Sequence, residues 1–418
     1  MDKTIKQVRS LAGQRVSGLE NSPPARGGVR GGGSIDYHSP PNLPSERGGK
    51  IKVAIVHDFL TKIGGAEKVT QSLSEIFPAA PIYTLLYDRK VDDWFPRKKI
   101  IVSYLQCWYK TFGVPQKLLL PWMALAIESF DFTGYDLVVS SNNSFAGGVI
   151  TPPHTVHISY CHSPTRYLWD AFHSYIEEQN LGRLSKWLLQ GLLHNLRIWD
   201  KLSSGRVTQY IANSQYVKNR IQKYYRKDAV VIHPPVDVGK IQPKTEHAEY
   251  FLVVSRLTPY KRIDLAIEAC NDLRLPLVII GEGEDMSRLK KLAGFSIEFL
   301  GWQSEQNKIE YLRNARALIF PGEEDFGIVP VEAMAAGKPV IAYRKGGTLE
   351  TIIEGKTGIF FNQPTVPALI GAIRDFMAAE DIFNTSFISR HAQQFSKERF
   401  QQTIIKLIRE ELKTCGKL

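Results

Sequence analysis

Cysteine is scarce in this chain of 418 residues, and the few thiols lie far apart in the sequence. The four are Cys107, Cys161, Cys270 and Cys415, without the close pairs that typically bind zinc. This spacing argues against a disulfide scaffold and against a cysteine-rich metal domain. We expect reduced thiols in a cytoplasmic protein.

Long apolar runs are also missing. The longest candidate, 118–127, is shorter than the roughly 18–20 residues of a membrane span and contains Pro121. The first residues show no apolar core followed by a small-residue cleavage site, so we expect no secretory signal. The first predicted strand leads to no Gly-x-Gly-x-x-Gly stretch, which disfavours an NAD-linked dehydrogenase.

What is present is a globular composition with an uneven charge. Hydrophobic residues make up 43% of the chain and charged residues 23%, enough for two ordinary domains with real cores. The formal net charge of +11 divides into +3 for residues 1–49, +8 for 50–248 and zero for 249–418. Nucleic acid, an anionic membrane, a phosphorylated substrate and a merely solubilising surface all fit this basic excess.

The pattern along the chain predicts four parts. Residues 1–49 are rich in Gly, Pro and Ser and are expected to be a disordered extension. From Ile51, buried strands alternate with helices through 50–240, and the alternation restarts after a Pro-rich linker at 233–249 and runs to about 395. The last part, 396–418, reads as an amphipathic helix that packs back toward the first domain.

Near-continuous apolar strands between helices indicate parallel sheets covered on both faces. We therefore predict an α/β protein with two Rossmann-like, doubly wound domains facing each other across a cleft. The ligand is expected at the carboxyl ends of both sets of strands.

Two loops at strand ends are suited to phosphate. Gly64 and Gly65 precede a predicted helix, where glycine allows close backbone approach and free N–H groups attract anions. A structural turn is the alternative. In the second domain, Arg256 leaves a strand and Lys261 starts the next helix. Cations at a helix N-terminus oppose the helix dipole, so an anion such as a diphosphate would explain them.

A polar and aromatic cluster follows the strand at 155–161. His162 stands beside Arg166, Tyr167, Trp169 and Asp170, in a loop that reaches the expected cleft. Aromatic faces with hydrogen-bonding groups between them suit a carbohydrate, so we expect these four neighbours of His162 to meet the acceptor. His162 itself is a candidate for hydrogen bonding or acid–base work. A structural histidine is the alternative.

The stretch PGEEDFGIVPVEAMAAGKPVI, 321–341, carries Glu332 inside an apolar helix. A carboxylate is costly there unless it faces the cleft, where it can accept hydrogen bonds from sugar hydroxyls. Glu324 lies eight residues earlier, about 12 Å away if all steps were helical. That distance disfavours a glycosidase pair, which needs roughly 5–9.5 Å. Capping of the helix explains one or two of Glu323, Glu324 and Asp325.

Four of these motifs together resemble the retaining glycosyltransferases of family four, which have the GT-B fold. They are GG at 64–65, HSP at 162–164, RLTPYK at 256–261 and EDFGIVPVEAMAAGKPVI at 324–341. The resemblance spans about residues 51–415 and is strongest in the second half. One departure is Asp325, which stands where Gly or Ser is frequent and leaves the donor sugar open.

The resemblance implies a role for each matching residue. Arg256 and Lys261 would hold the diphosphate of a nucleotide sugar, Glu332 the ribose and Glu324 the donor sugar. Backbone amides would contribute from Phe326, Gly327 and Ile328. His162 would contact the donor sugar, while Gly64 and Gly65 let the first loop approach. The resemblance also implies retention of anomeric configuration, no cofactor and no catalytic metal, in keeping with the missing Asp-x-Asp motif.

Two further likenesses to known enzymes suggest which donor the protein uses. YCHSPTRYLWD, 160–170, looks like mannosyltransferases that build bacterial surface polysaccharides. Glu305 stands where related guanine-nucleotide enzymes carry an acid, and a carboxylate accepts from both guanine N1–H and N2–H₂. We therefore hypothesise GDP-mannose as donor; simple helix capping by Glu305 is the alternative.

The helix expected at 183–202 mixes Trp187, Trp199 and leucines with basic residues, as a helix at an anionic bilayer does. The alternative is an ordinary core helix. We expect a peripheral protein at the inner face of the plasma membrane, with a glycan or lipid-linked acceptor. A nucleotide-sugar epimerase or phosphorylase on the same fold, and a non-catalytic membrane or RNA adaptor, remain competing interpretations; nucleic acid explains the fewest residues.

Overall fold

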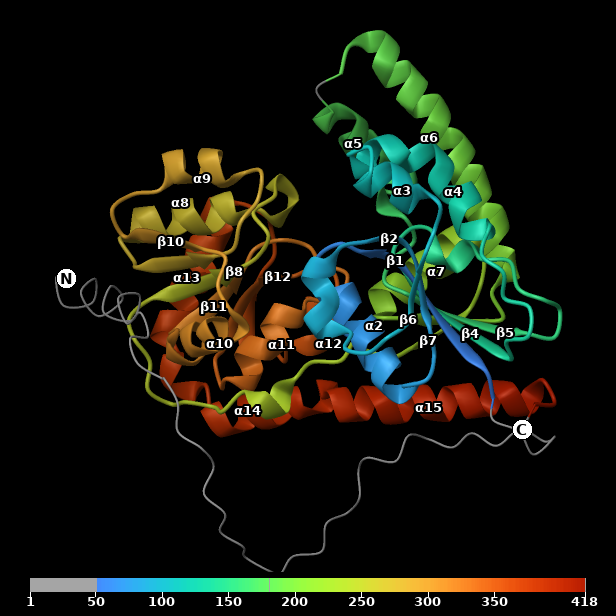
Figure 1. The fold of residues 1–418 in the computed structure, drawn as a ribbon. Helices are drawn as coiled ribbons and strands as arrows, with labels where there is room; N and C mark the ends of the chain where they lie inside the picture. Colours follow the sequence, from blue (N-terminus) through green and yellow to red (C-terminus); the bar gives the residue numbers. More distant parts are fainter. Residues whose placement is uncertain (1–50, 180, 418) are drawn as a thin grey trace, which may run out of the picture.

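The computed structural model describes residues 51–179 and 181–417. The predicted disordered extension, 1–49, lies outside the described residues. The described chain forms two α/β domains side by side, with the long helix α15 running beneath the first of them (Figure 1).

The first domain is built on a seven-stranded sheet. Its order is β3-β2-β1-β4-β5-β6-β7, and every neighbouring pair is parallel. The strands are β1 (Val53–Leu60), β2 (Ile82–Tyr87), β3 (Ile100–Val102), β4 (Leu137–Asn142), β5 (Val156–Cys161), β6 (Gln209–Ala212) and β7 (Ala229–Val231).

Strand β1 is longer than the sequence predicts. The apolar run IKVAIV, 51–56, predicts a strand that ends at Val56, and HDFLTKIGG, 57–65, reads as the loop that follows. Instead the strand continues to Leu60, since His57 pairs with Thr84 and Leu60 with Tyr87 of β2. Two polar side chains, His57 and Asp58, are thus buried inside the sheet.

The second domain has a six-stranded sheet of order β10-β9-β8-β11-β12-β13, again parallel throughout. Its strands are β8 (Phe251–Val254), β9 (Leu277–Ile280), β10 (Ile297–Gly301), β11 (Ala317–Phe320), β12 (Val340–Tyr343) and β13 (Gly358–Phe361). Four of them, β8, β9, β11 and β12, are almost fully buried apolar runs, as strands covered by helices on both faces must be.

Helices connect the strands of both sheets. Those of the first domain are α2 (Gly65–Ile76), α3 (Leu105–Lys110), α4 (Leu120–Glu128), α5 (Phe172–Glu178), α6 (Arg183–Ser203) and α7 (Gln215–Tyr225). Those that follow are α8 (Ile263–Leu273), α9 (Met286–Leu292), α10 (Glu305–Asn314), α11 (Ile328–Ala335), α12 (Thr348–Thr351), α13 (Val366–Ala378), α14 (Thr385–Ala392) and α15 (Lys397–Thr414).

Helix α15 belongs in space to the first domain although it follows the second in sequence. Its apolar side chains Phe400, Ile404 and Ile408 are buried in the same core as Ile55 of β1 and Leu73 of α2. Hydrophobic burial along this helix therefore links the two domains a second time, besides the connection between β7 and β8.

One boundary differs from the expectation for the phosphate loop. We expected Lys261 to start a helix, but Pro259–Lys261 is a short 3-10 turn and α8 begins at Ile263. Arg262 between them has a left-handed backbone with φ of 53°, which separates the turn from the helix. Lys261 therefore stands just before the helix. Among the described residues, no helix is long and apolar enough to cross a membrane.

Candidate functional site

The glycine loop of the first domain touches the helix start of the second. Gly65 is the first residue of α2, and a Cβ atom there would lie 2.9 Å from Cδ1 of Ile328. Ile328 opens α11 in the other domain. Any larger residue at position 65 would force the side chain of Ile328 to move. The glycine loop thus directly faces the start of α11, where the family resemblance implies backbone amides that bind the donor.

The three acids before α11 are paired with side chains rather than capping that helix. Lys261 contacts the carboxylate of Glu324, and Asp325 accepts a hydrogen bond of 2.8 Å from Arg220 of α7. Glu323 accepts from the ammonium of Lys345 at 2.9 Å. The N-cap position of α11 is Gly327, with φ of 88° and no side-chain cap. Capping was the alternative explanation for one or two of these acids, but Glu323 instead accepts a second hydrogen bond, from the hydroxyl of Tyr216 across the domain boundary.

Glu332 faces the boundary between the domains, as its place in the helix suggested. Its side chain is only 3% exposed and accepts hydrogen bonds from Lys68 of α2 at 3.0 Å and Lys308 of α10 at 2.8 Å. Burial raises the pKa of Glu332, but the two ammonium groups outweigh it and leave this pKa lowered. The carboxylate is therefore ionised, and it is held by one lysine from each domain.

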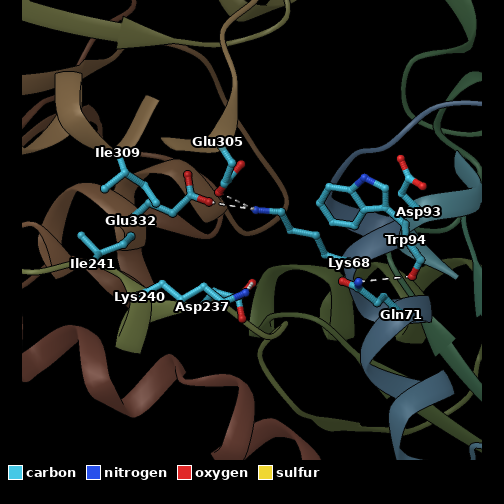
Figure 2. A pocket seen from close by; sticks show the side chains of 10 residues that line it. All are labelled: Lys68, Gln71, Asp93, Trp94, Asp237, Lys240, Ile241, Glu305, Ile309 and Glu332. Atoms are coloured by element: carbon cyan, nitrogen blue, oxygen red, sulfur yellow. Dashed lines mark hydrogen bonds and ion pairs between the residues drawn. The ribbon is translucent and has the colours of Figure 1, made fainter. Parts of the chain in front are cut away.

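A pocket of about 260 Å³ lies against this carboxylate (Figure 2). Its walls come from α2, the connection after β7, α10 and α11, and include Lys68, Asp237 and Glu305. Glu305 is the first residue of α10, 48% exposed, and accepts from Lys308 at 2.9 Å. The helix cap itself is Ser304, whose hydroxyl accepts from the amide of Asn307. Ser304 therefore caps α10, and Glu305 is not needed for that role.

Cations from both domains surround the approach to Glu324. Arg256 is exposed just after β8. Burial and the neighbouring charge of Arg256 lower the pKa of Lys261 to about 7, and Arg166 of the first domain adds to this effect. The carboxylate of Glu324 already contacts Lys261, and an arriving phosphate group would relieve the repulsion between the cations further.

His162 is buried after β5, with its ring Nε2 at 2.8 Å from the hydroxyl of Ser141. Burial and the nearby His57 lower the pKa of His162 to about 3. The imidazole is therefore neutral at physiological pH. It can donate a hydrogen bond with its single proton or accept one, but it lacks the second proton with which an imidazolium ion acts as an acid.

The four residues predicted to meet the acceptor divide into two pairs. Asp170 binds Arg220, the same arginine that holds Asp325, and Arg166 lies 3.8 Å from Asp170. In contrast, the indole N–H of Trp169 donates to Asp200 at 2.7 Å and its ring stacks on Tyr224. Tyr167 packs against Tyr175. Trp169 and Tyr167 support the loop, while Arg166 and Asp170 lie near the acids before α11.

Three side chains at the domain boundary were not identified from the sequence. Lys68 reaches Glu332, Arg220 reaches Asp325, and the carboxylate of Glu350 in α12 accepts from the amides of Gln215 and Tyr216 at 2.8 and 3.2 Å. Lys68 lies one turn beyond Gly64, which was its only local signal. Within the described ranges, no group of three His, Cys, Asp or Glu side chains could hold a metal ion; metal independence stays a prediction.

Comparisons with known proteins agree with this architecture. Residues 63–240 match the family model described as Glycosyltransferase Family 4, and residues 238–400 match Glycosyl transferases group 1. The chain belongs to glycosyltransferase family 4. The two matches adjoin at the connection between the domains and together include Gly64, Arg256, Glu324 and Glu332.

Two similar proteins match about half of the chain each. An uncharacterized glycosyltransferase of Methanocaldococcus jannaschii is 29% identical over 210 residues, which is 48% of this chain and 58% of that protein. The α-1,3/1,6-mannosyltransferase ALG2 of Homo sapiens is 26% identical over 250 residues, or 50% of this chain and 60% of that protein. The chain thus spans less than two thirds of the length of these relatives.

Solved structures share the fold over nearly the whole family 4 unit. Anabaena HepE in complex with UDP-glucose has a TM-score of 0.63 at 16% identity, covering 85% of this chain and 99% of that one. Sucrose-phosphate synthase from Thermosynechococcus elongatus has a TM-score of 0.64 at 16% identity, covering 86% and 100%. Together with the two parallel sheets, these likenesses confirm the predicted GT-B fold.

Proposed function

We propose that this protein is a retaining glycosyltransferase that moves a hexose from a nucleotide-diphosphate sugar to a hydroxyl of a glycan or lipid-linked acceptor. The observation that carries the proposal is the meeting of Lys261 with Glu324 beside α11, opposite Gly65 of the other domain. A cation for phosphate and a carboxylate for sugar hydroxyls are thereby in contact at the boundary of two Rossmann-like domains.

The chemistry follows from where charge develops. As the bond between the anomeric carbon and the phosphate oxygen breaks, negative charge builds on the diphosphate. Arg256 and Lys261 stabilise that charge, and the amides of Phe326, Gly327 and Ile328 add hydrogen bonds at the helix start. The acceptor oxygen bonds to the anomeric carbon on the same face, and its proton passes to the departing phosphate oxygen.

Two carboxylates orient the donor in this scheme. Glu324 accepts hydrogen bonds from the transferred sugar, so its contact with Lys261 is exchanged for contacts in which both groups hold the donor. Glu332, already ionised by its lysines, accepts from the ribose hydroxyls. His162 contributes a neutral hydrogen bond to the sugar from the first domain. No cofactor is needed, since the nucleotide sugar is itself a substrate.

GDP-mannose is the proposed donor. Support comes from Glu305, whose carboxylate edges the same pocket as Glu332 and can accept from two guanine N–H groups, where uracil offers one. It also comes from the relatives, several of which are named mannosyltransferases. The UDP complexes of Anabaena HepE make UDP-sugars the main competing donors.

A donor screen with the purified protein tests these statements separately. Turnover of GDP-mannose with product of unchanged anomeric configuration, insensitive to EDTA, is the expected result. Turnover with UDP-sugars and none with GDP-mannose overturns the donor assignment, while an inverted product overturns the retaining mechanism. Nucleotide release must require an acceptor; conversion of the donor without one would indicate an epimerase.

We also propose that an anionic lipid surface presents the acceptor, at the inner face of the plasma membrane. The support is an exposed apolar face on α6, where Leu184 and Trp187 are 70% and 67% exposed, flanked by Arg183 and Lys186. Neighbouring α3 and α4 add the exposed rings of Trp108 and Trp122, 5.4 Å apart. Apolar side chains beside basic ones suit the headgroup region of an anionic bilayer.

A further inference from the structure

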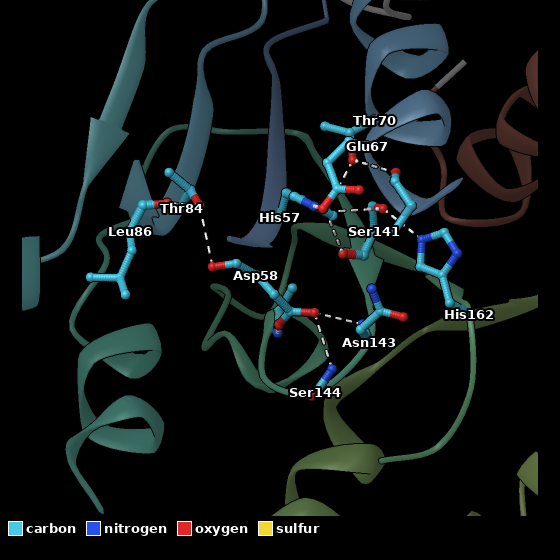
Figure 3. Close-up of polar contacts among 12 residues, drawn as sticks. His57, Asp58, Glu67, Thr70, Thr84, Leu86, Ser141, Asn143, Ser144 and His162 are labelled. Carbon is cyan, nitrogen blue, oxygen red and sulfur yellow. Dashed lines mark hydrogen bonds and ion pairs between the residues drawn. The ribbon is translucent and has the colours of Figure 1, made fainter. Parts of the chain in front are cut away.

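A chain of buried polar groups runs from helix α2 through the first sheet to His162 (Figure 3). His57, in β1 and only 1% exposed, occupies its centre. It contacts Glu67 and Thr70 of α2 on one side and Ser141 of β4 on the other. Buried polar groups of this kind are costly unless their hydrogen bonds are satisfied, so their pairing determines where each proton lies.

The proton positions on His57 follow from its neighbours. Its Nδ1 is 3.1 Å from the carbonyl oxygen of Ser141, which can only accept, so Nδ1 carries a proton. The hydroxyl of Thr70 donates to the carbonyl of Ala66, which leaves its oxygen to accept from the same Nδ1 at 3.0 Å. On the other side, Nε2 is 3.4 Å from a carboxylate oxygen of Glu67, again an acceptor.

His57 is therefore placed as an imidazolium ion. Burial lowers the pKa of His57, but the hydrogen bond and charge of Glu67, with the charge of Asp58 and the carbonyl of Ser141, leave it raised. The groups that face its ring are Glu67 and Thr70 from α2, Asp58 beside it in β1, Ser141 from β4 and His162 beyond.

These assignments also determine the direction in which the hydroxyl of Ser141 donates its hydrogen. Its oxygen lies 3.2 Å from the protonated Nδ1 of His57 and 2.8 Å from Nε2 of His162. Because the protonated Nδ1 of His57 cannot accept a hydrogen bond, the hydrogen of the Ser141 hydroxyl points to His162 instead. Nε2 of His162 accepts, and the single proton of that neutral ring lies on Nδ1. No hydrogen bond in the described part of the chain uses this Nδ1.

We propose that Glu67, His57 and Ser141 are positioning residues that fix His162 in the Nδ1–H tautomer, so that it donates a hydrogen bond to the transferred sugar and does not act as an acid or base. This inference rests on the proposed function for the identity of the sugar ligand. The backbone supports the same orientation, since His162 N–H donates to Asn142 at 2.9 Å and the amide side chain of Asn213 donates to the carbonyl of His162 at 2.9 Å.

Nitrogen NMR of the full chain with ¹⁵N-labelled histidine tests the tautomer directly, with His162→Asn and His57→Asn spectra for assignment. We expect His162 to hold its proton on Nδ1 and not to titrate between pH 6 and 8, while His57 shows two protonated nitrogens at pH 6. A proton on Nε2 of His162, or titration of His162 in this range, overturns the proposal. Absence of sugar transfer with the expected spectrum would instead reject the proposed function.

Variants separate positioning from folding. Ser141→Ala should mix the two tautomers of His162 and lower kcat about tenfold, as loss of one hydrogen bond does. Glu67→Gln should lower the pKa of the His57 imidazolium. The pH at which kcat falls on the alkaline side of its profile should shift down with it. Glu75→Gln, on the same helix and paired instead with Lys397, should change neither. Unaltered tautomer and kcat in both Ser141→Ala and Glu67→Gln would contradict the proposal.

Discussion

The ammonium of Lys68 donates to the carboxylate of Glu332 over 3.0 Å, joining the first domain to the helix that lines the pocket in the second. Lys308 holds the other oxygen of the same carboxylate at 2.8 Å. Glu332 is thus kept charged and oriented before any ligand arrives. A ribose that binds there meets an acceptor whose direction is already fixed, which reduces the entropic cost of binding.

Replacing this carboxylate should weaken the binding of the donor. We expect Glu332→Ala to reduce nucleotide-diphosphate affinity by about 10- to 100-fold, the loss of hydrogen bonds to a charged group. Calorimetric titration with GDP measures it. Glu410→Ala, on the exposed side of α15, is the matched control and should bind as the parent does. Equal affinity of parent and Glu332→Ala would remove the ribose assignment.

The two cations proposed to hold the diphosphate, Arg256 and Lys261, should affect the affinity for nucleoside diphosphates more than that for monophosphates. Arg256→Ala and Lys261→Ala should each lose about 10- to 100-fold in affinity for a nucleoside diphosphate, because charged hydrogen bonds to its second phosphate are lost. Affinity for the nucleoside monophosphate should change far less. Competition binding with both nucleotides compares the two, and an equal loss for each would place these cations elsewhere on the ligand.

The lowered pKa of Lys261, about 7, gives donor binding a pH dependence. A bound diphosphate raises this pKa, so the favourable interaction is complete below pH 7 and declines as pH rises toward the pKa of the complex. In that window affinity should fall by about tenfold per pH unit. Titrations from pH 6 to 9 measure the slope.

Lys261→Arg provides the control for this slope, because arginine stays charged throughout. Its affinity should vary little with pH once the titration of the phosphate itself is subtracted. The same slope in parent and Lys261→Arg would show that another group is responsible.

Base recognition depends on Glu305 in this account. Glu305→Ala should lower the affinity for GDP by about tenfold and leave the affinity for UDP nearly unchanged, because the one carboxylate accepts hydrogen bonds from two N–H groups of guanine. Glu310→Ala lies on the same helix, α10, where Glu310 binds Arg313, and tests for a general effect of losing an acid there. A parallel loss for GDP and UDP in Glu305→Ala would contradict guanine selection.

The exposed face of α6 predicts lipid binding. Trp187→Ser together with Leu184→Ser should reduce co-sedimentation with anionic vesicles several-fold, because these side chains supply the buried apolar area. Phe295→Ser removes a side chain that is 72% exposed on the second domain, and it should have no effect. Equal binding of the parent to anionic and neutral vesicles would remove the membrane assignment.

The sequence was sufficient to predict which of the candidate residues lie at strand ends. Glu324 and Glu332 follow β11, Arg256 follows β8, and parallel sheets bring such positions to one edge. It was insufficient where a side chain pairs with a distant partner. Lys68 has the pattern of any basic residue on a surface helix, and only the packing of the two domains brings it to Glu332.

The same limit explains the misjudged strand. Polar residues in a buried strand look like its end, because burying them is normally costly. His57 and Asp58 are tolerated because their partners come from elsewhere: Ser141 lies 84 residues away, and the carboxylate of Asp58 accepts four backbone amides from 143–146. Neither partner could be inferred from local periodicity.

The most direct test of the central claim is transfer of label from a panel of radioactive nucleotide sugars into membrane lipid extracts. The account predicts labelled product from GDP-mannose with the parent and with Glu410→Ala, and a fall of about 100-fold in rate with Glu324→Ala, which loses its contact to the transferred sugar. Absence of labelled product from every donor in the panel, or equal rates for the parent and Glu324→Ala, would contradict it.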